Sequence, residues 1–121
     1  MSKSKIIAVD FDGTLCENKW PNIGAANGYL IDILIRLQRE KGFKLILWTC
    51  RTGQHLDDAV AWCEKRGLIF NAVNENLPEM IDAFGGDTRK IVATYYLDDK
   101  SIGALQLGNM AYEKEEVVQD G

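Results

Sequence analysis

Short apolar runs recur along the first hundred residues, separated by longer amphipathic stretches. The runs are residues 5–9 (KIIAV), 44–49 (KLILWT), 68–73 (LIFNAV) and 91–97 (IVATYYL). Their length and their β-branched or aromatic side chains are typical of strands buried on both faces. The pattern therefore predicts four core strands.

The stretches between these runs carry apolar side chains at helical spacing. A first helix is predicted over residues 29–38, with Gly42 as its C-cap, and a second amphipathic helix is predicted to stop at Gly67. A third, shorter helix starts near Pro78, because proline favours the first helical position, and ends by residues 85–86.

Alternation of strands and helices predicts right-handed crossovers, a parallel sheet and a three-layer α/β sandwich. The loops at residues 10–14, 49–53 and 98–100 then open at one edge of the sheet, where such folds bind ligands. The 121 residues are interpreted as one domain, 1–121, with a core over about 5–100 and a weakly patterned segment at 101–121.

The composition narrows the class of protein. Hydrophobic residues make up 46% and charged residues 26%, which fits a globular domain and excludes a disordered or collagen-like chain. A formal net charge of −4 disfavours non-specific binding to nucleic acid or an anionic membrane. The three cysteines lack metal-site spacing, and the N-terminal residues do not resemble a leader. No apolar run approaches the roughly 18 residues that a membrane helix needs. Together these features favour a cytoplasmic protein.

Acidic residues gather at the ends of the predicted strands. The first strand leads into Asp10-Phe11-Asp12-Gly13-Thr14, the last leads into Asp98 and Asp99, and the second ends at Thr49. A lone pair of aspartates is often a solvated loop end. Several carboxylates at one sheet edge, however, repel one another unless a cation or a shared proton compensates, and oxygen ligands suit Mg²⁺.

This arrangement resembles the haloacid dehalogenase superfamily, in its small capless branch. The resemblance rests on DFDGT after the first strand, a threonine after the second and an acidic pair after the last. It implies a Rossmann-like core, Mg²⁺, and phosphoryl transfer through an aspartyl-phosphate, usually as a phosphatase acting on a phosphorylated substrate.

The resemblance assigns roles to the acidic residues. Asp10 is expected to be the nucleophile and a metal ligand. Asp12 is expected to be the general acid and then the general base, and to give its backbone carbonyl to the metal. Asp98 is the expected direct metal ligand, and Asp99 is expected to act through water or by orienting a partner.

Two further residues are expected to bind the substrate phosphate. Thr49 matches the motif whose hydroxyl donates to a phosphate oxygen, and Arg51 completes a Thr-x-Arg pattern found in some members. The alternatives are that Thr49 is an ordinary strand-end residue and that Arg51 is a solvated surface arginine. Lys90 is the candidate for the third-motif lysine, but a strand rising about 3.3 Å per residue leaves it at the wrong end of the sheet. Either that strand begins later, or Arg51 or Lys100 replaces it.

The segment between the first strand and the first helix, residues 15–28, is predicted to be a short loop, which leaves no room for a cap domain. An open site suits a bulky or macromolecular substrate, or a neighbouring subunit of a homo-oligomer acts as the lid. Trp20, Pro21 and Ile23 either form an apolar rim for the leaving group or fold back on the core.

Two other functions remain open from the sequence. A phospho-accepting receiver-like regulatory module has a similar length and similar acidic residues, although its acceptor aspartate follows a middle strand, where this chain has Thr49 and Val73. The other alternative is a non-catalytic protein that binds Mg²⁺ or phosphate on the same fold.

Overall fold

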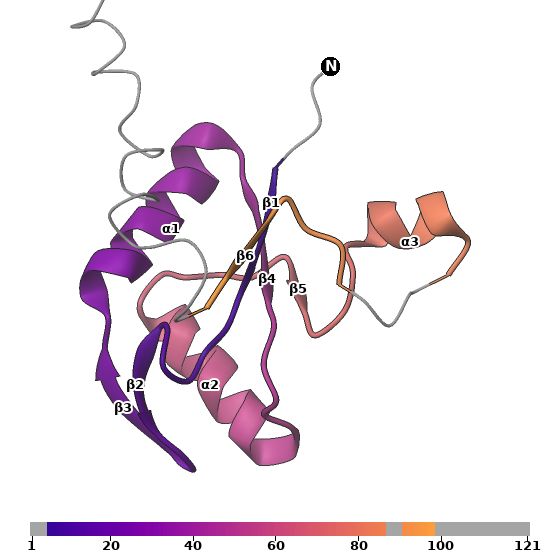
Figure 1. Cartoon of the computed structure of the whole chain (residues 1–121). Coiled ribbons are helices and arrows are strands. Elements are labelled where there is room, and N and C mark those ends of the chain that lie inside the picture. The colour runs from indigo at the N-terminus through magenta and orange to yellow at the C-terminus, as the bar shows by residue number, and fades with distance from the viewer. Residues whose placement is uncertain (1–4, 87–90, 99–121) are drawn as a thin grey trace, which may run out of the picture.

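The computed structural model describes residues 5–86 and 91–98, and its centre is a four-stranded parallel sheet (Figure 1). The strands are β1 (Ile6–Val9), β4 (Lys44–Leu47), β5 (Ala72–Val73) and β6 (Tyr95–Leu97), in the order β5-β4-β1-β6. The predicted parallel α/β class is confirmed. The described ranges form this one unit, with no additional domain.

Three helices follow the strands as the apolar periodicity predicted. They are α1 (Gly28–Lys41), α2 (Gly53–Lys65) and α3 (Pro78–Phe84). Helix α1 ends where Gly42 adopts a left-handed conformation, and α3 begins with its proline. Within the described ranges, no helix has the length and apolar character that a membrane span requires.

The two faces of the sheet are covered by different elements, which makes three layers. Alternate side chains of a strand point to opposite faces. Ile7 and Val9 pack with α1 and α2 in the larger core, whereas Ile6 and Ala8 pack with Leu77 and its neighbours on the other face. Figure 1 shows α1 and α2 together on one side of the sheet and α3 on the other.

All four core strands are shorter than the sequence predicted, and two of them are much shorter. Of residues 68–73 only β5 is a strand, and of residues 91–97 only β6 is. Side chains of Asn71 and Thr94 explain the difference, because they replace ladder partners: Asn71 Oδ1 accepts the amide of Leu45 at 2.8 Å, and Thr94 Oγ1 accepts the amide of Ile6 at 3.0 Å.

The expectation of a short loop at residues 15–28 is wrong. The segment forms an antiparallel hairpin of β2 (Cys16–Lys19) and β3 (Asn22–Ala26). Gly24 permits this pairing, since a Cβ atom there would lie 2.5 Å from the carbonyl oxygen of Glu17. The mostly exposed and polar strands hid the period-two signal in the sequence.

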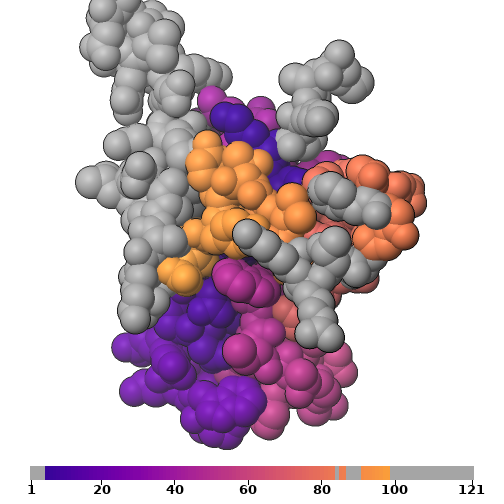
Figure 2. All heavy atoms as spheres, turned by 45° about the vertical axis from the view of Figure 1, so that its right-hand side comes forward, coloured from indigo at the N-terminus to yellow at the C-terminus, as the bar shows by residue number. Residues whose placement is uncertain are grey.

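The apolar residues of the hairpin differ in burial. Ile23 packs against the larger core, whereas Trp20 stands 54% exposed at the tip, joined to Pro21 by a cis peptide bond. Figure 2 shows the violet hairpin beside the start of α2 at the lower end of the molecule.

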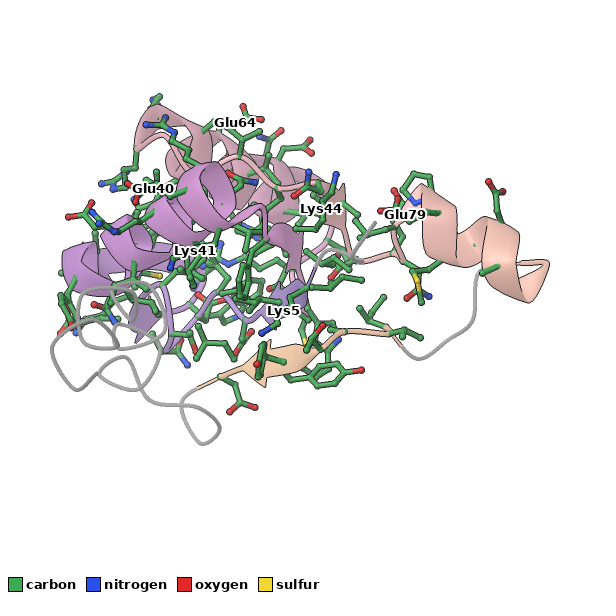
Figure 3. All side chains as sticks on the ribbon, turned by 90° about the horizontal axis from the view of Figure 1, so that it is seen from above. Lys5, Glu40, Lys41, Lys44, Glu64 and Glu79 are labelled. Atoms are coloured by element: carbon green, nitrogen blue, oxygen red, sulfur yellow. The ribbon has the colours of Figure 1, made fainter. Side chains whose placement is uncertain are left out.

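The two ends of the sheet carry different charged residues. At the amino end Lys5 precedes β1, Lys41 ends α1 and Lys44 begins β4, and Figure 3, which views the molecule from this end, also labels Glu40, Glu64 and Glu79. The amino end therefore carries charges of both signs. At the opposite end Asp10 and Asp98 follow adjacent strands, and two neighbouring carboxylates favour a cation.

Candidate functional site

Strand register places the ends of β1, β4 and β6 side by side. Val9 pairs with Leu47 on one side and with Leu97 on the other. The ladder continues one step further, because the amide of Asp10 donates to the carbonyl of Leu97 at 2.9 Å and that of Trp48 donates to Val9 at 2.8 Å. Asp10 and Asp98 therefore leave adjacent strands at the same level.

This level is also where the strand order reverses. From β1 the chain crosses to β4 and then to β5 on one side, and it returns to β6 on the other side of β1. Parallel α/β sheets bind their ligands at the carboxyl ends of the strands flanking such a reversal. The topology thus points to the same edge as the acidic residues.

A pocket opens at this edge, and we call it the acidic pocket. It is lined by Asp10, Trp48, Thr49, Cys50 and Asp98 and has a volume of about 240 Å³. A water molecule takes about 30 Å³ in the liquid, so the pocket has room for a phosphate group and several waters. Three of the residues named from the sequence share it.

The acidic pocket offers the donors that Mg²⁺ prefers, although its described side chains do not complete a metal site alone. Among residues 5–86 and 91–98, no three His, Cys, Asp or Glu side chains gather closely enough to hold a metal. Mg²⁺ usually takes one or two carboxylates and keeps several waters. Asp10 and Asp98, with the backbone carbonyl of Asp12, fit that donor set.

Thr49 is held in the pocket by two hydrogen bonds, one to its backbone and one to its side chain. Its amide donates to Asn74 Oδ1 at 2.8 Å, and its Oγ1 accepts the amide of Arg51 at 3.2 Å. This contact does not use the hydroxyl proton of Thr49, which is free to rotate toward a phosphate oxygen and donate to it. The sequence did not predict the contact between Asn74 and Thr49. The position of Asn74 after a strand is nevertheless typical of the left-handed conformation that it adopts, with φ of 54°.

Arg51 lies at the centre of a buried ion pair rather than on the surface. Its side chain is 1% exposed, its Nε donates to Asp12 Oδ2 at 2.9 Å, and its Nη2 donates to Asp12 Oδ1 at 2.7 Å. This is the bidentate geometry of a strong charge-assisted pair. The hydrogen bonds that Arg51 donates to Asp12 raise the pKa of Arg51, so the guanidinium is permanently charged.

The same guanidinium fastens the hairpin to the core. Arg51 Nη2 donates to the carbonyl of Asn22 at 3.1 Å, and Nη1 donates to that of Pro21 at 3.3 Å. Its planar group also lies between two aromatic rings, 5.0 Å from the centroid of Phe11 and 4.9 Å from that of Trp20. The sequence analysis expected Arg51 to meet the phosphate; the structure engages all its nitrogens with Asp12 and backbone carbonyls.

Asp12 lines a second pocket, next to the acidic pocket, which we call the hairpin pocket. Its lining residues are Asp12, Asn18, Trp20, Cys50 and Arg51, and its volume is about 290 Å³. Cys50 lines both pockets, which makes them neighbours. The two aspartates of the DFDGT motif therefore serve adjoining spaces, Asp10 the acidic pocket and Asp12 the hairpin pocket.

The three cysteines differ sharply in accessibility. Cys50 is exposed, whereas Cys16 and Cys63 are buried. Burial raises the pKa of the Cys63 thiol to about 12 and also raises that of Cys16. Cys50 is thus the one thiol of the three that substrates and reagents can reach.

Four predictions fall on residues outside the described ranges. They are the third-motif candidate Lys90, the acidic partner Asp99, the alternative cation Lys100 and the segment 101–121.

Comparison with known proteins finds one relevant structure. No protein-family model matches the chain, and no curated protein matches it. A solved structure described as that of a conserved protein from Bacteroides thetaiotaomicron is 40% identical, covers 93% of both chains and superposes with a TM-score of 0.77. That description assigns no activity, so the comparison supports kinship and fold.

Proposed function

This chain belongs to the same family as the conserved Bacteroides thetaiotaomicron protein, and we propose that it is a Mg²⁺-dependent phosphatase of the haloacid dehalogenase type. The reaction is the hydrolysis of a phosphomonoester through an aspartyl-phosphate on Asp10. The observation that carries the proposal is the shared level of Asp10, Thr49 and Asp98 in one pocket at the strand reversal.

Asp10 is suited to the first step by its position. Its Oδ1 accepts the amide of Phe11 at 2.8 Å, which fixes the carboxylate against its own backbone. In the proposed step an oxygen of Asp10 bonds to phosphorus while the bond from phosphorus to the leaving oxygen breaks. Thr49 donates its hydroxyl proton to a non-bridging phosphate oxygen and orients the group.

Asp12, which lines the adjoining hairpin pocket, acts as the general acid and then as the general base. For this role Asp12 carries a proton at the start of the cycle. It gives that proton to the leaving oxygen, and it regains one from the water that attacks phosphorus and releases Asp10. Both Asp12 oxygens accept from Arg51, yet a carboxylate has about four acceptor sites, so two sites remain for these transfers. Two roles are thereby divided between two carboxylates in different surroundings.

Bound Mg²⁺ would neutralise the charge of the phosphate and of Asp10, which is the usual contribution of a divalent cation to phosphoryl transfer. The residues that would hold it are Asp10, Asp98 and the backbone carbonyl of Asp12.

Activity is expected to require the metal. We expect phosphate release from p-nitrophenyl phosphate and a panel of phosphomonoesters with Mg²⁺ and a loss of about 100-fold or more in EDTA, since several kcal/mol of charge stabilisation disappear. Asp98→Asn is expected to raise the Mg²⁺ concentration needed for half-maximal activity about tenfold or more, because one of two carboxylate ligands is lost.

The matched control is Glu64→Gln, which removes an exposed carboxylate from the last turn of α2, at the opposite end of the strands. Its metal requirement should equal that of the wild type. A folded wild-type protein that binds Mg²⁺ in calorimetry and releases no phosphate from any substrate would contradict the proposal and favour the non-catalytic alternative.

A further inference from the structure

Resting on the proposed function, we propose that the hairpin pocket takes a planar aromatic leaving group, which stacks on the exposed ring of Trp20. The substrate class is then a phosphomonoester whose leaving group carries an aryl ring or a heteroaromatic base.

The first argument is the exposure of Trp20. Large aromatic side chains bury 150–250 Å² when they pack, and leaving one in water forfeits that stabilisation. Trp20 is 54% exposed, although Ile23 a few residues on finds a place against the core. About half of the surface of Trp20 is therefore left for another group to cover.

The second argument is that this ring is already immobilised. The charged guanidinium of Arg51 lies 4.9 Å from its centroid, and the ring of His55 meets it at 4.9 Å with an interplanar angle of 62°. The amide of Trp20 donates to Asn18 Oδ1 at 3.2 Å. A surface fixed in advance binds a planar group without the entropy cost of ordering a mobile side chain.

The backbone around Trp20 is fixed by the same buried cation. Arg51, 1% exposed, holds the carbonyls of Pro21 and Asn22, directly after Trp20 in the chain. It also holds both oxygens of Asp12. One guanidinium therefore sets the position of the aromatic ring relative to the proposed general acid.

The third argument is the place of the ring relative to the chemistry. Trp20 lines the pocket that contains Asp12, and the acidic pocket with Asp10 and Thr49 lies next to it. In the proposed reaction Asp12 protonates the leaving oxygen, so the leaving group must extend into the space beside Asp12. A volume of about 290 Å³ admits a single or fused aromatic ring.

Trp48, the other exposed tryptophan, is less suited to this role. It lines the acidic pocket, where phosphate is expected, and its ring packs at 5.5 Å against Tyr96. Stacking by Trp48 rather than Trp20 is therefore an outcome that the test must be able to detect.

The experiment compares substrates that differ in ring planarity alone. Benzyl phosphate and cyclohexylmethyl phosphate both release a primary alcohol of similar acidity, and only the former carries a flat ring. We expect wild-type kcat/KM to favour benzyl phosphate about 3- to 10-fold, the range given by aromatic pair energies. Trp20→Leu should remove most of this ratio, and Trp20→Phe should retain most of it.

Two further variants make the comparison specific. Tyr29→Leu removes a side chain that is also 54% exposed and lines neither pocket, so its substrate ratio should equal that of the wild type. If Trp48→Leu abolishes the ratio while Trp20→Leu keeps it, the assignment to Trp20 is overturned. Thermal unfolding of each variant establishes that it is folded.

A second pair of substrates separates the two sources of an aromatic group. Adenosine 5′-monophosphate and ribose 5-phosphate both carry the phosphate on the primary 5-hydroxyl of ribose, and a Trp20-dependent preference for the former identifies a nucleobase. The alternative result is that Trp20→Leu lowers kcat/KM for phenyl phosphate and O-phosphotyrosine but leaves the ratio of adenosine 5′-monophosphate to ribose 5-phosphate unchanged. That result identifies an aryl phosphate. Each result supports a planar leaving group.

Binding gives a readout that needs no turnover. In the Asp10→Asn protein with Mg²⁺, adenosine 5′-monophosphate and benzyl phosphate should bind more tightly than their ring-free partners, and adding Trp20→Leu should remove the difference. Equal hydrolysis and equal binding of planar and non-planar partners would overturn the inference while leaving the phosphatase proposal intact. Tight ring binding without any wild-type hydrolysis would instead contradict the phosphatase proposal alone.

Discussion

Asp10→Asn is expected to lower phosphatase kcat by on the order of 10⁴-fold, the largest effect of any single substitution in this chain. An amide oxygen is a far weaker nucleophile than a carboxylate oxygen, so the covalent step is lost. Steady-state phosphate release with saturating Mg²⁺ measures the change. Asparagine keeps the shape of the side chain and an oxygen that can accept the amide of Phe11, which Asp10 accepts at 2.8 Å.

The fold of the Asp10→Asn protein should therefore persist, and its unfolding temperature should lie close to that of the wild type. Substantial residual turnover in a folded Asp10→Asn protein would mean that another group attacks phosphorus.

Arg51→Met is expected to lower both stability and kcat. Breaking a buried ion pair on one side costs about 3 kcal/mol, because the partner charge loses its compensation. Arg51 and Asp12 have side chains that are 1% and 18% exposed, so water replaces little of the lost contact. For a domain of this size we expect a fall in unfolding temperature of about 10 °C. A displaced general acid should also lower kcat about 100-fold.

Two variants distinguish an Arg51 that positions Asp12 from an Arg51 that binds the phosphate. Arg51→Lys keeps the charge without the fork that binds both Asp12 oxygens, so kcat should stay low while KM for a small phosphomonoester stays near the wild-type value. Arg39→Met, on the exposed surface of α1, should change stability by less than about 0.5 kcal/mol. A large rise in KM with unchanged stability in Arg51→Lys would instead mean that Arg51 binds the phosphate.

The sequence was sufficient to predict the architecture because its signals are local and strong. The buried runs of β1 and β4 are continuous and apolar, and the helices end at Gly42 and Gly85, which both adopt left-handed conformations. The carboxyl ends of parallel strands meet at one edge of the sheet, so the sequence alone groups Asp10, Thr49 and Asp98 there. The structure places these three in one pocket.

The hairpin and the ion pair were missed because they depend on contacts between distant residues. No local pattern links Arg51 to Asp12, 39 residues away, or to the carbonyl of Pro21. A sequence does not indicate which backbone carbonyls lie near a side chain. An arginine beside a phosphate-binding motif is therefore predicted to bind phosphate. Its burial between Phe11 and Trp20 is visible only in three dimensions.

The strand lengths were overestimated for a similar reason. Thr94 has high β-propensity and lies in an apolar run, yet its side chain takes the hydrogen bond that would continue the ladder from Ile6. Propensity alone does not distinguish a side-chain partner from a backbone partner.

Direct identification of the phosphorylated residue is the decisive measurement. The wild-type protein with Mg²⁺ and a rapidly hydrolysed phosphomonoester is quenched in acid, digested and analysed by mass spectrometry for a phosphoryl group on the peptide that contains Asp10. The account predicts a hydroxylamine-sensitive phosphoryl group on Asp10 that is missing in Asp10→Asn. Phosphoryl transfer to the exposed thiol of Cys50, or turnover without any covalent phosphoprotein, would contradict it.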